Sequence, residues 1–153
     1  VDTRIKKLKD GTYDAIMLSY AGIKFLNFDS EISEIFSPEK IIPSAGQGII
    51  ALQCREDDEE IISVLKKINH NETFMRAHVE RNILKVLEGD CETAVGAHSV
   101  IAGDKITVEA ELFSLDGSKR YYEKKTGKVE DFSQIGEEVG QILKTKSNNS
   151  YKR

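Results

Sequence analysis

A change in the spacing of apolar residues constrains the fold of this chain more than any other feature. Residues 106–112 alternate between apolar and polar types, whereas residues 13–19 and 49–54 are almost continuously apolar. Alternation is typical of a strand with one face in a core, and a continuous run is typical of a strand buried on both faces. The sequence therefore predicts a parallel α/β part followed by an antiparallel part, with the boundary near residues 69–72.

The antiparallel part is expected to hold a three-stranded sheet. Gly103-Asp104 and Asp116-Gly117 are turn signals that separate three segments of strand character. Helices are predicted over residues 72–88 and 132–144, where apolar residues recur every three or four positions. We expect both helices to cover one face of the sheet.

The ends of this part carry local signals. Asp131 and Gln134 have the spacing of a capping box at the start of the last helix. The final residues, 147–153, are polar and basic without periodicity, which predicts a disordered tail.

The first half predicts only part of a doubly wound α/β sheet. Helices are expected over residues 1–10, 31–36 and 57–68, around the strands at 13–19 and 49–54. Two strands cannot enclose such a sheet, so we expect a preceding region to supply the others. The chain also begins at Val1 without an initiator Met or signal peptide, which favours the interior of a longer polypeptide.

Composition excludes several classes of protein. The 153 residues carry 26 acidic and 22 basic side chains, a net charge of −4, which gives no support to non-specific binding of nucleic acid or anionic membranes. No run approaches the ~18 apolar residues of a membrane span. We expect a soluble, cytoplasmic protein with reduced cysteines, and the scattered histidines predict no metal site.

Few residues stand out as candidates for chemistry. Cys91 lies between Asp90 and Glu92, and because adjacent negative charge raises a thiol pKa, it suits a permanent attachment point better than a recurring nucleophile. The alternative is a small buried hydrophobe, which is the interpretation for Cys54. Gln47 in its glycine loop and Arg4 are weaker candidates, a plain turn and a solvated surface arginine being the alternatives.

The combination of motifs resembles the porphobilinogen deaminase (hydroxymethylbilane synthase) family. Residues 80–96 (ERNILKVLEGDCETAVG) resemble the family's cofactor-attachment signature. Four further segments agree in order and spacing: residues 1–4 (VDTR), 13–16 (YDAI), 21–24 (AGIK) and 42–48 (IPSAGQG). The resemblance covers essentially the whole chain.

The resemblance implies an arrangement of three domains. Residues 1–43 would form the C-terminal part of the second α/β domain, which is similar to periplasmic binding proteins. Residues 44–69 would return to the first α/β domain, and residues 72–146 would form the third, cofactor-carrying α+β domain. The missing N-terminal portion of the enzyme would be the partner of this chain, and the complete protein is expected to be a monomer.

The resemblance also implies a transferase of tetrapyrrole (haem) biosynthesis. Family members join four porphobilinogen units head to tail on a covalent dipyrromethane, expel ammonia at each step, and release linear hydroxymethylbilane by hydrolysis. By motif, Cys91 would carry the dipyrromethane through a thioether, and Arg4 would bind a carboxylate arm of the growing polypyrrole. The other matching cofactor and substrate positions are Thr3, Ser19, Gly22, Gln47 and Gly48.

Three departures from the family pattern concern the site. Asp90 replaces a small residue, Ala94 replaces a proline, and Phe25 stands where many members have an arginine. The catalytic aspartate of the family lies in the missing first domain, so we expect this chain to be inactive by itself. Two alternatives remain open: a non-catalytic module that binds small anions, and an inactive truncated third domain.

Overall fold

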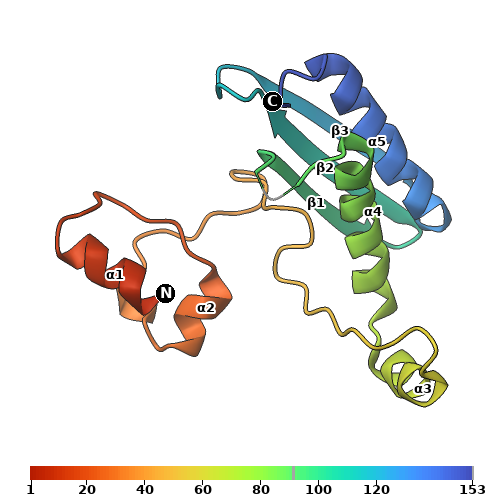
Figure 1. The fold of residues 1–153 in the computed structure, drawn as a ribbon, viewed down its shortest axis with the longest axis horizontal. Helices are drawn as coiled ribbons and strands as arrows, with labels where there is room; N and C mark the ends of the chain where they lie inside the picture. Colours follow the sequence, from red (N-terminus) through yellow and green to blue (C-terminus); the bar gives the residue numbers. More distant parts are fainter. Residues whose placement is uncertain (91, 153) are drawn as a thin grey trace. The chain divides into compact units, whose positions relative to one another are not determined.

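The computed structural model describes residues 1–90 and 92–152. The chain forms two compact units, Val1–Ser37 and Pro38–Arg153 (Figure 1). Each unit is built around its own buried side chains. The division after residue 37 separates two compact units and does not test the predicted family domains. The domain boundaries at residues 43, 69 and 146 stay predictions.

The first unit is helical. Helix α1 (Asp2–Lys9) confirms the predicted N-terminal helix, and α2 (Tyr20–Phe25) and the 3-10 turn η1 (Asp29–Glu31) follow. Ile5 of α1 and Ile23 of α2 are its buried apolar residues. An exposed ion pair of 2.6 Å between Lys9 Nζ and Glu31 Oε1 links α1 to η1.

The second unit contains the predicted three-stranded antiparallel sheet. Strands β1 (Val95–Ala102), β2 (Lys105–Phe113) and β3 (Arg120–Lys128) lie in the order β1-β2-β3. The structure confirms the alternation along β2. Its alternate apolar residues are fully buried, whereas the intervening residues face the other side; the buried set is Ile106, Val108, Ala110 and Leu112. The opposite face is polar, with Glu109 bonded to Lys124 and Tyr122.

Helices α4 (Asn71–Leu87) and α5 (Phe132–Ser147) lie side by side on the apolar face of the sheet (Figure 1). Helix α3 (Glu59–Ile68) precedes α4, and the 3-10 turn η2 (Val129–Asp131) precedes α5. The sequence predicted α3, α4 and α5 correctly, with both α4 and α5 on one sheet face. The core they enclose with the sheet includes Val79, Ile83, Leu87, Val108, Leu112, Val139 and Leu143.

The two strands predicted in the first half are wrong for this structure. Residues 13–19 and 49–54 form no strand, and their apolar side chains include Met17 at 61% and Ile50 at 89% exposed. A strand needs a neighbour to receive its backbone hydrogen bonds, and the described residues place none beside either segment. Cys54, predicted to be core, is therefore only half-buried.

Three smaller predictions are also corrected. No helix covers residues 31–36, where the chain leaves η1 in irregular structure. Asp131 caps α5 without a side-chain hydrogen bond, and Gln134 instead donates to Glu138 at 2.9 Å. The predicted disordered tail is folded at Tyr151, which is 5% exposed because its ring packs against the core and its hydroxyl donates to the Leu87 carbonyl. None of the helices formed by the described residues has the length and apolar character needed to span a bilayer.

Candidate functional site

The C-terminal end of α4 is held firmly just before Cys91. Glu88 adopts a left-handed conformation with φ of 54°, and the Gly89 N–H donates to the Leu84 carbonyl at 3.0 Å. This pattern ends a helix while satisfying its last carbonyls. Cys91 itself lies outside the described residues, so the structure gives its flanks and not its side chain.

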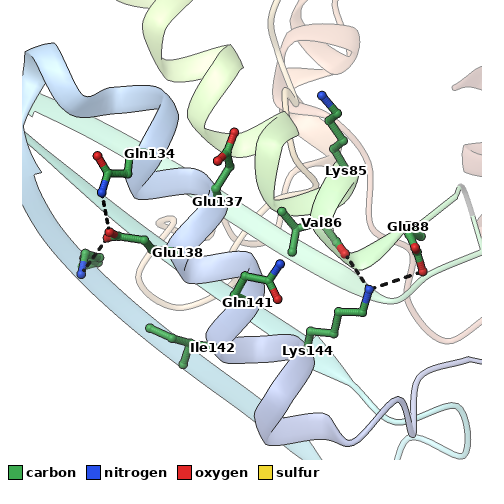
Figure 2. A pocket seen from close by; sticks show the side chains of 10 residues that line it. Lys85, Val86, Glu88, Gln134, Glu137, Glu138, Gln141, Ile142 and Lys144 are labelled. Carbon is green, nitrogen blue, oxygen red and sulfur yellow. Dashed lines mark hydrogen bonds and ion pairs between the residues drawn. The ribbon is translucent and has the colours of Figure 1, made fainter.

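Side chains from the C-terminal region complete this helix end. Lys144 of α5 donates to the Val86 carbonyl at 3.2 Å, and Tyr151 donates to the Leu87 carbonyl at 2.9 Å (Figure 2 for Lys144). Lys152 hydrogen-bonds Glu88, and this bond, with the charge of Lys144, lowers the pKa of the Glu88 carboxyl. The loop that follows α4 therefore starts from a fixed base.

Asp90 folds the residues that flank Cys91 into a turn. Its Oδ1 accepts the Glu92 N–H at 2.9 Å, the Thr93 N–H at 3.1 Å and the Thr93 hydroxyl at 3.2 Å. The backbone bond from Glu92 is the largest cause of the lowered pKa of Asp90. We expect this carboxylate to be ionised at neutral pH, and its charge is engaged by donors of its own loop.

An open groove of about 810 Å³ runs between α4 and α5 beside this helix end (Figure 2). Its walls mix both signs of charge. The residues that line it are Lys85, Val86, Glu88, Lys125, Gln134, Glu137, Glu138, Gln141, Ile142 and Lys144. Lys144 already binds the Val86 carbonyl and Glu88. Its contacts in this groove therefore link α5 to the end of α4.

The glycine loop predicted to contact the cofactor leaves its backbone open. Gly46 and Gly48 have φ of 73° and 78°, and no heavy atom lies within 4 Å of where a Cβ would be at either residue. Gln47 between them is exposed. Glycines with positive φ and open space let a ligand approach the main chain closely. The main chain of this loop is therefore open to close approach by a ligand.

This loop borders a cavity of about 330 Å³ in the second unit. Gln47, Gly48, Arg76, Glu80 and His98 line it together with Pro38, Pro43, Ile49 and Thr73. Arg76 Nη2 lies 3.5 Å from His98 Nε2. The Nε of Arg76 is buried, and among the described residues it has no hydrogen-bond partner.

Glu80 is the buried carboxyl side chain of this region. It is 4% exposed, and its Oε2 accepts the Gly46 N–H at 2.8 Å. Its Oε1 accepts the Ser99 N–H at 2.9 Å and the Ser99 hydroxyl at 2.8 Å. One side chain of α4 thus binds the glycine loop and β1 at the same time.

The predicted site residues of the first unit are exposed or half-buried. Thr3 and Arg4 lie exposed on α1, and Arg4 forms no ion pair with the described residues. Ser19 is the N-cap of α2, where its Oγ accepts the Gly22 N–H at 3.1 Å. Phe25, the departure from an arginine, is 86% exposed.

The structure brings together only some of the predicted residues. Ser19 and Gly22 are in contact within the first unit, and Gln47 and Gly48 share one loop of the second. Sequence reasoning missed Glu80, Arg76 and His98 as parts of the site. The available signal was Glu80 itself, a charged residue beside Val79 and one turn before Ile83 in the apolar stripe of α4. Among the described residues, no group of histidine, cysteine and carboxylate side chains is placed to hold a metal ion.

Within each unit, some of the predicted residues have the chemistry to bind an acidic ligand. In the second unit, the open glycine loop offers backbone and amide donors. In the first unit, the exposed Arg4 offers a guanidinium that forms no ion pair with the described residues. The turn formed by Asp90 fixes the loop on both sides of Cys91. No described group contradicts such a ligand.

Comparisons with known proteins agree with these features. Residues 1–63 match the family model "Porphobilinogen deaminase, dipyromethane cofactor binding domain", and residues 74–145 match "Porphobilinogen deaminase, C-terminal domain". The cofactor domain named by the first model is thus represented in the chain.

Individual relatives give the same result. A porphobilinogen deaminase of Desulforamulus reducens is 37% identical over 143 residues, which cover 94% of this chain and 46% of that protein. The Coxiella burnetii enzyme is 38% identical over 143 residues (94% and 47%), and that of Corynebacterium efficiens is 34% identical over 146 residues (94% and 49%). The chain spans about half the length of the curated relatives it matches. With two family models that together span most of its length, the chain belongs to the porphobilinogen deaminase family.

Proposed function

We propose that this chain is the C-terminal portion of a hydroxymethylbilane synthase, which polymerises four porphobilinogen units in tetrapyrrole biosynthesis. The observation that carries the proposal is the loop at residues 88–93. It holds the attachment signature of the family and is braced on both sides of Cys91 by the end of α4 and by the Asp90 turn. A thioether from Cys91 would tether a dipyrromethane there.

The bound group would supply the pyrrole to which the first porphobilinogen is joined, and each later unit would be joined to the one before it, with ammonia as the leaving group. The chain's own residues hold and orient the acidic arms. Arg4 would pair with a carboxylate through two parallel N–H donors, which suit a planar carboxylate. Gln47 and the amides around Gly48 would donate hydrogen bonds from the open glycine loop.

The first unit holds three further positions that the proposal assigns to ligand binding. Thr3 precedes Arg4 on α1, and Ser19 and Gly22 form the start of α2. Because Ser19 Oγ already accepts the Gly22 N–H, the hydroxyl proton of Ser19 is the group left to donate to a ligand.

The proposal includes a companion portion of the same enzyme. Ile61, Val64 and Ile68 of α3 are 43%, 48% and 64% exposed, an apolar face that a folded partner would cover. The runs at residues 13–19 and 49–54 would then pair with strands of a doubly wound, periplasmic-binding-protein-like sheet. The companion would also supply the catalytic aspartate, and the complete enzyme would be a cytoplasmic monomer.

In this scheme the chain contributes to all three domains of the enzyme. Residues 1–43 complete the second domain, residues 44–69 return to the first, and residues 72–146 form the third. Helices α4 and α5 on the three-stranded sheet support the last of these assignments, since they share one core.

The test is to supply this chain with the N-terminal portion of the Coxiella burnetii relative, by co-expression, and to measure intact mass and porphobilinogen turnover. We expect a dipyrromethane adduct on the Cys91 peptide and formation of hydroxymethylbilane. Cys91→Ala should abolish both the adduct and turnover, because it removes the only sulfur that the motif assigns to the tether.

Cys54→Ala is the matched control, since Cys54 is half-buried and lies outside the signature. It should leave the adduct and turnover largely intact. Equal loss from both substitutions would contradict the assignment of the tether. An adduct-free, inactive mixture that still binds small carboxylates would favour a non-catalytic binding module.

A further inference from the structure

Glu80 connects three parts of the second unit through one buried carboxylate. It projects from α4, its Oε2 accepts from Gly46 in the glycine loop, and its Oε1 accepts twice from Ser99 in β1. With 4% exposure, the carboxylate is almost completely removed from water. Its three hydrogen bonds therefore replace the hydration that burial took away.

The two carboxylate oxygens of Glu80 bind different segments, and together these contacts fix the side chain. Oε1 is held by β1, so the position of Oε2 is determined by the sheet and by α4. The Gly46 N–H can keep its 2.8 Å bond only where Oε2 lies. Hydrogen bonds to a charged acceptor are short and about twice as strong as neutral ones. Glu80 thus transmits the position of α4 to the glycine loop.

Few other contacts hold the loop. At its start the Ala97 N–H donates to the Pro43 carbonyl at 2.8 Å, and Ala45 packs against the core. The local bonds of the loop are those from Gln47 N to Ser44 O at 3.0 Å and from Ile49 N to Gly46 O at 3.2 Å. Gly46 and Gly48 have positive φ and open space around them, so neither is wedged by packing. A glycine-rich turn of this kind has many accessible backbone conformations unless an outside contact selects one.

We propose that Glu80 is a positioning residue that sets Gln47 and Gly48 relative to α4, the helix whose end carries the Cys91 loop. This inference rests on the proposed function, because it makes Glu80 the link between the tether and the loop that holds the acidic arms. Glu80 acts through the Gly46 N–H, since both of its carboxylate oxygens already accept hydrogen bonds from the protein.

Glu80→Gln separates the contact with Gly46 from the contact with Ser99. A glutamine has a single acceptor oxygen, so one of the two sides must face an NH₂ group. Oxygen toward Gly46 would leave the N–H of Ser99, which is 0% exposed, without a partner, whereas the half-buried Gly46 can reach water. We therefore expect the amide to turn its oxygen to Ser99 and release Gly46. Ser99→Ala is the matched control, because it removes one hydrogen bond of Glu80 but leaves both backbone N–H donors in place.

The first measurement is hydrogen exchange of the Gly46 amide by NMR, on the 153-residue chain. We expect protection in the unsubstituted chain and in Ser99→Ala, and loss of protection in Glu80→Gln while the amides of β2 remain protected. Equal protection of Gly46 in all three proteins would overturn the link. This result does not depend on any catalytic activity.

The second measurement is turnover by the co-expressed enzyme, divided by the number of molecules that carry the adduct by mass. We expect Glu80→Gln to lower kcat/KM per loaded molecule by about 10- to 100-fold, the effect of a small misplacement, and Ser99→Ala to stay within about twofold of the unsubstituted enzyme. A purely structural role would reduce the loaded fraction and leave turnover per loaded molecule unchanged, which would overturn the inference. If the unsubstituted enzyme lacks turnover although Gly46 is protected, the proposed function fails and the link in the fold stands.

Discussion

Asp90 shows how a residue's role depends on contacts that its neighbours in sequence do not reveal. From sequence, its charge is a poor environment for a cysteine nucleophile. In the structure, the same carboxylate accepts three hydrogen bonds from Glu92 and Thr93 and shapes the loop. The Asp90 side chain thus stabilises a defined turn and restricts the backbone of the loop.

Asp116 plays a similar part in the turn between β2 and β3. It accepts hydrogen bonds from the Ser114 hydroxyl at 2.6 Å and from the Ser118 N–H at 3.1 Å. These bonds, led by that from Ser114, lower the pKa of Asp116 from 3.8 to about 2. Because the folded pKa lies below the unfolded one, the ionised carboxylate stabilises the fold above pH 3.8, and this contribution is lost as pH falls toward 2.

We therefore predict that Asp116→Asn lowers the Tm at pH 7 and that the difference from the unsubstituted chain shrinks below about pH 4. Thermal unfolding followed by circular dichroism between pH 2 and 7 measures this difference. Asp104→Asn, in the turn between β1 and β2, is the control for the loss of one turn carboxylate. A Tm difference for Asp116→Asn that is constant over this range would contradict the proposed linkage.

At the scale of elements, α4 and α5 approach unusually closely because α5 carries glycines at the contact. A Cβ built on Gly136 would lie 2.4 Å from the Val79 carbonyl oxygen of α4, and one on Gly140 would lie 2.8 Å from Val86 Cβ. Real side chains do not tolerate such distances. The two glycines therefore allow the main chains of the two helices to come together beneath the sheet.

We predict that Gly136→Ala destabilises the protein by about 1–3 kcal/mol, the usual cost of overpacking. The sign of the change in the free energy of unfolding is informative, because an alanine in an open helix position stabilises by about 0.5–1 kcal/mol relative to glycine. Urea unfolding gives the free energy directly. Thr145→Ala, on the exposed side of α5, serves as the control and should be neutral or slightly stabilising. Stabilisation by Gly136→Ala would mean that the helices are farther apart than described.

At the scale of the whole molecule, α3 is the element whose surroundings remain incomplete. None of its residues is buried, although its apolar residues line one side of the helix. An amphipathic helix obtains most of its stability in proteins from packing of its apolar face. The exposed face is consistent with a chain that spans about half the length of its relatives.

We predict that the double substitution Ile61→Ser and Ile68→Ser leaves the Tm of the isolated chain nearly unchanged, because both side chains are exposed there. In co-expression with the N-terminal portion of a relative, the same change should lower the yield of complex several-fold, since burial of each side chain contributes about 1.5–3 kcal/mol. Size-exclusion chromatography measures the yield, and Lys66→Ser on the same helix is the control. An unchanged yield would show that this face is not covered by the companion.

The sequence by itself determined the elements whose evidence is local. Strict alternation identified β2, and apolar spacing of three and four residues identified α4 and α5, because each pattern matches the period of its own secondary structure. Motif spacing likewise identified the family, since a signature of this length is specific without any knowledge of the fold. The role of Cys91 in that signature stays a prediction.

Tertiary structure alone decided the remaining features, because they depend on partners distant in sequence. The runs at residues 13–19 and 49–54 have strand composition but form no strand without a neighbour to pair with. Tyr151 is ordered because Leu87, 64 residues away, offers a carbonyl beside the core. Glu80 reads as a helix residue in sequence, and only the approach of Gly46 and Ser99 makes it a buried junction. Local patterns can specify which segments become helices and strands, but contacts between segments decide which of them are buried, paired and placed at the site.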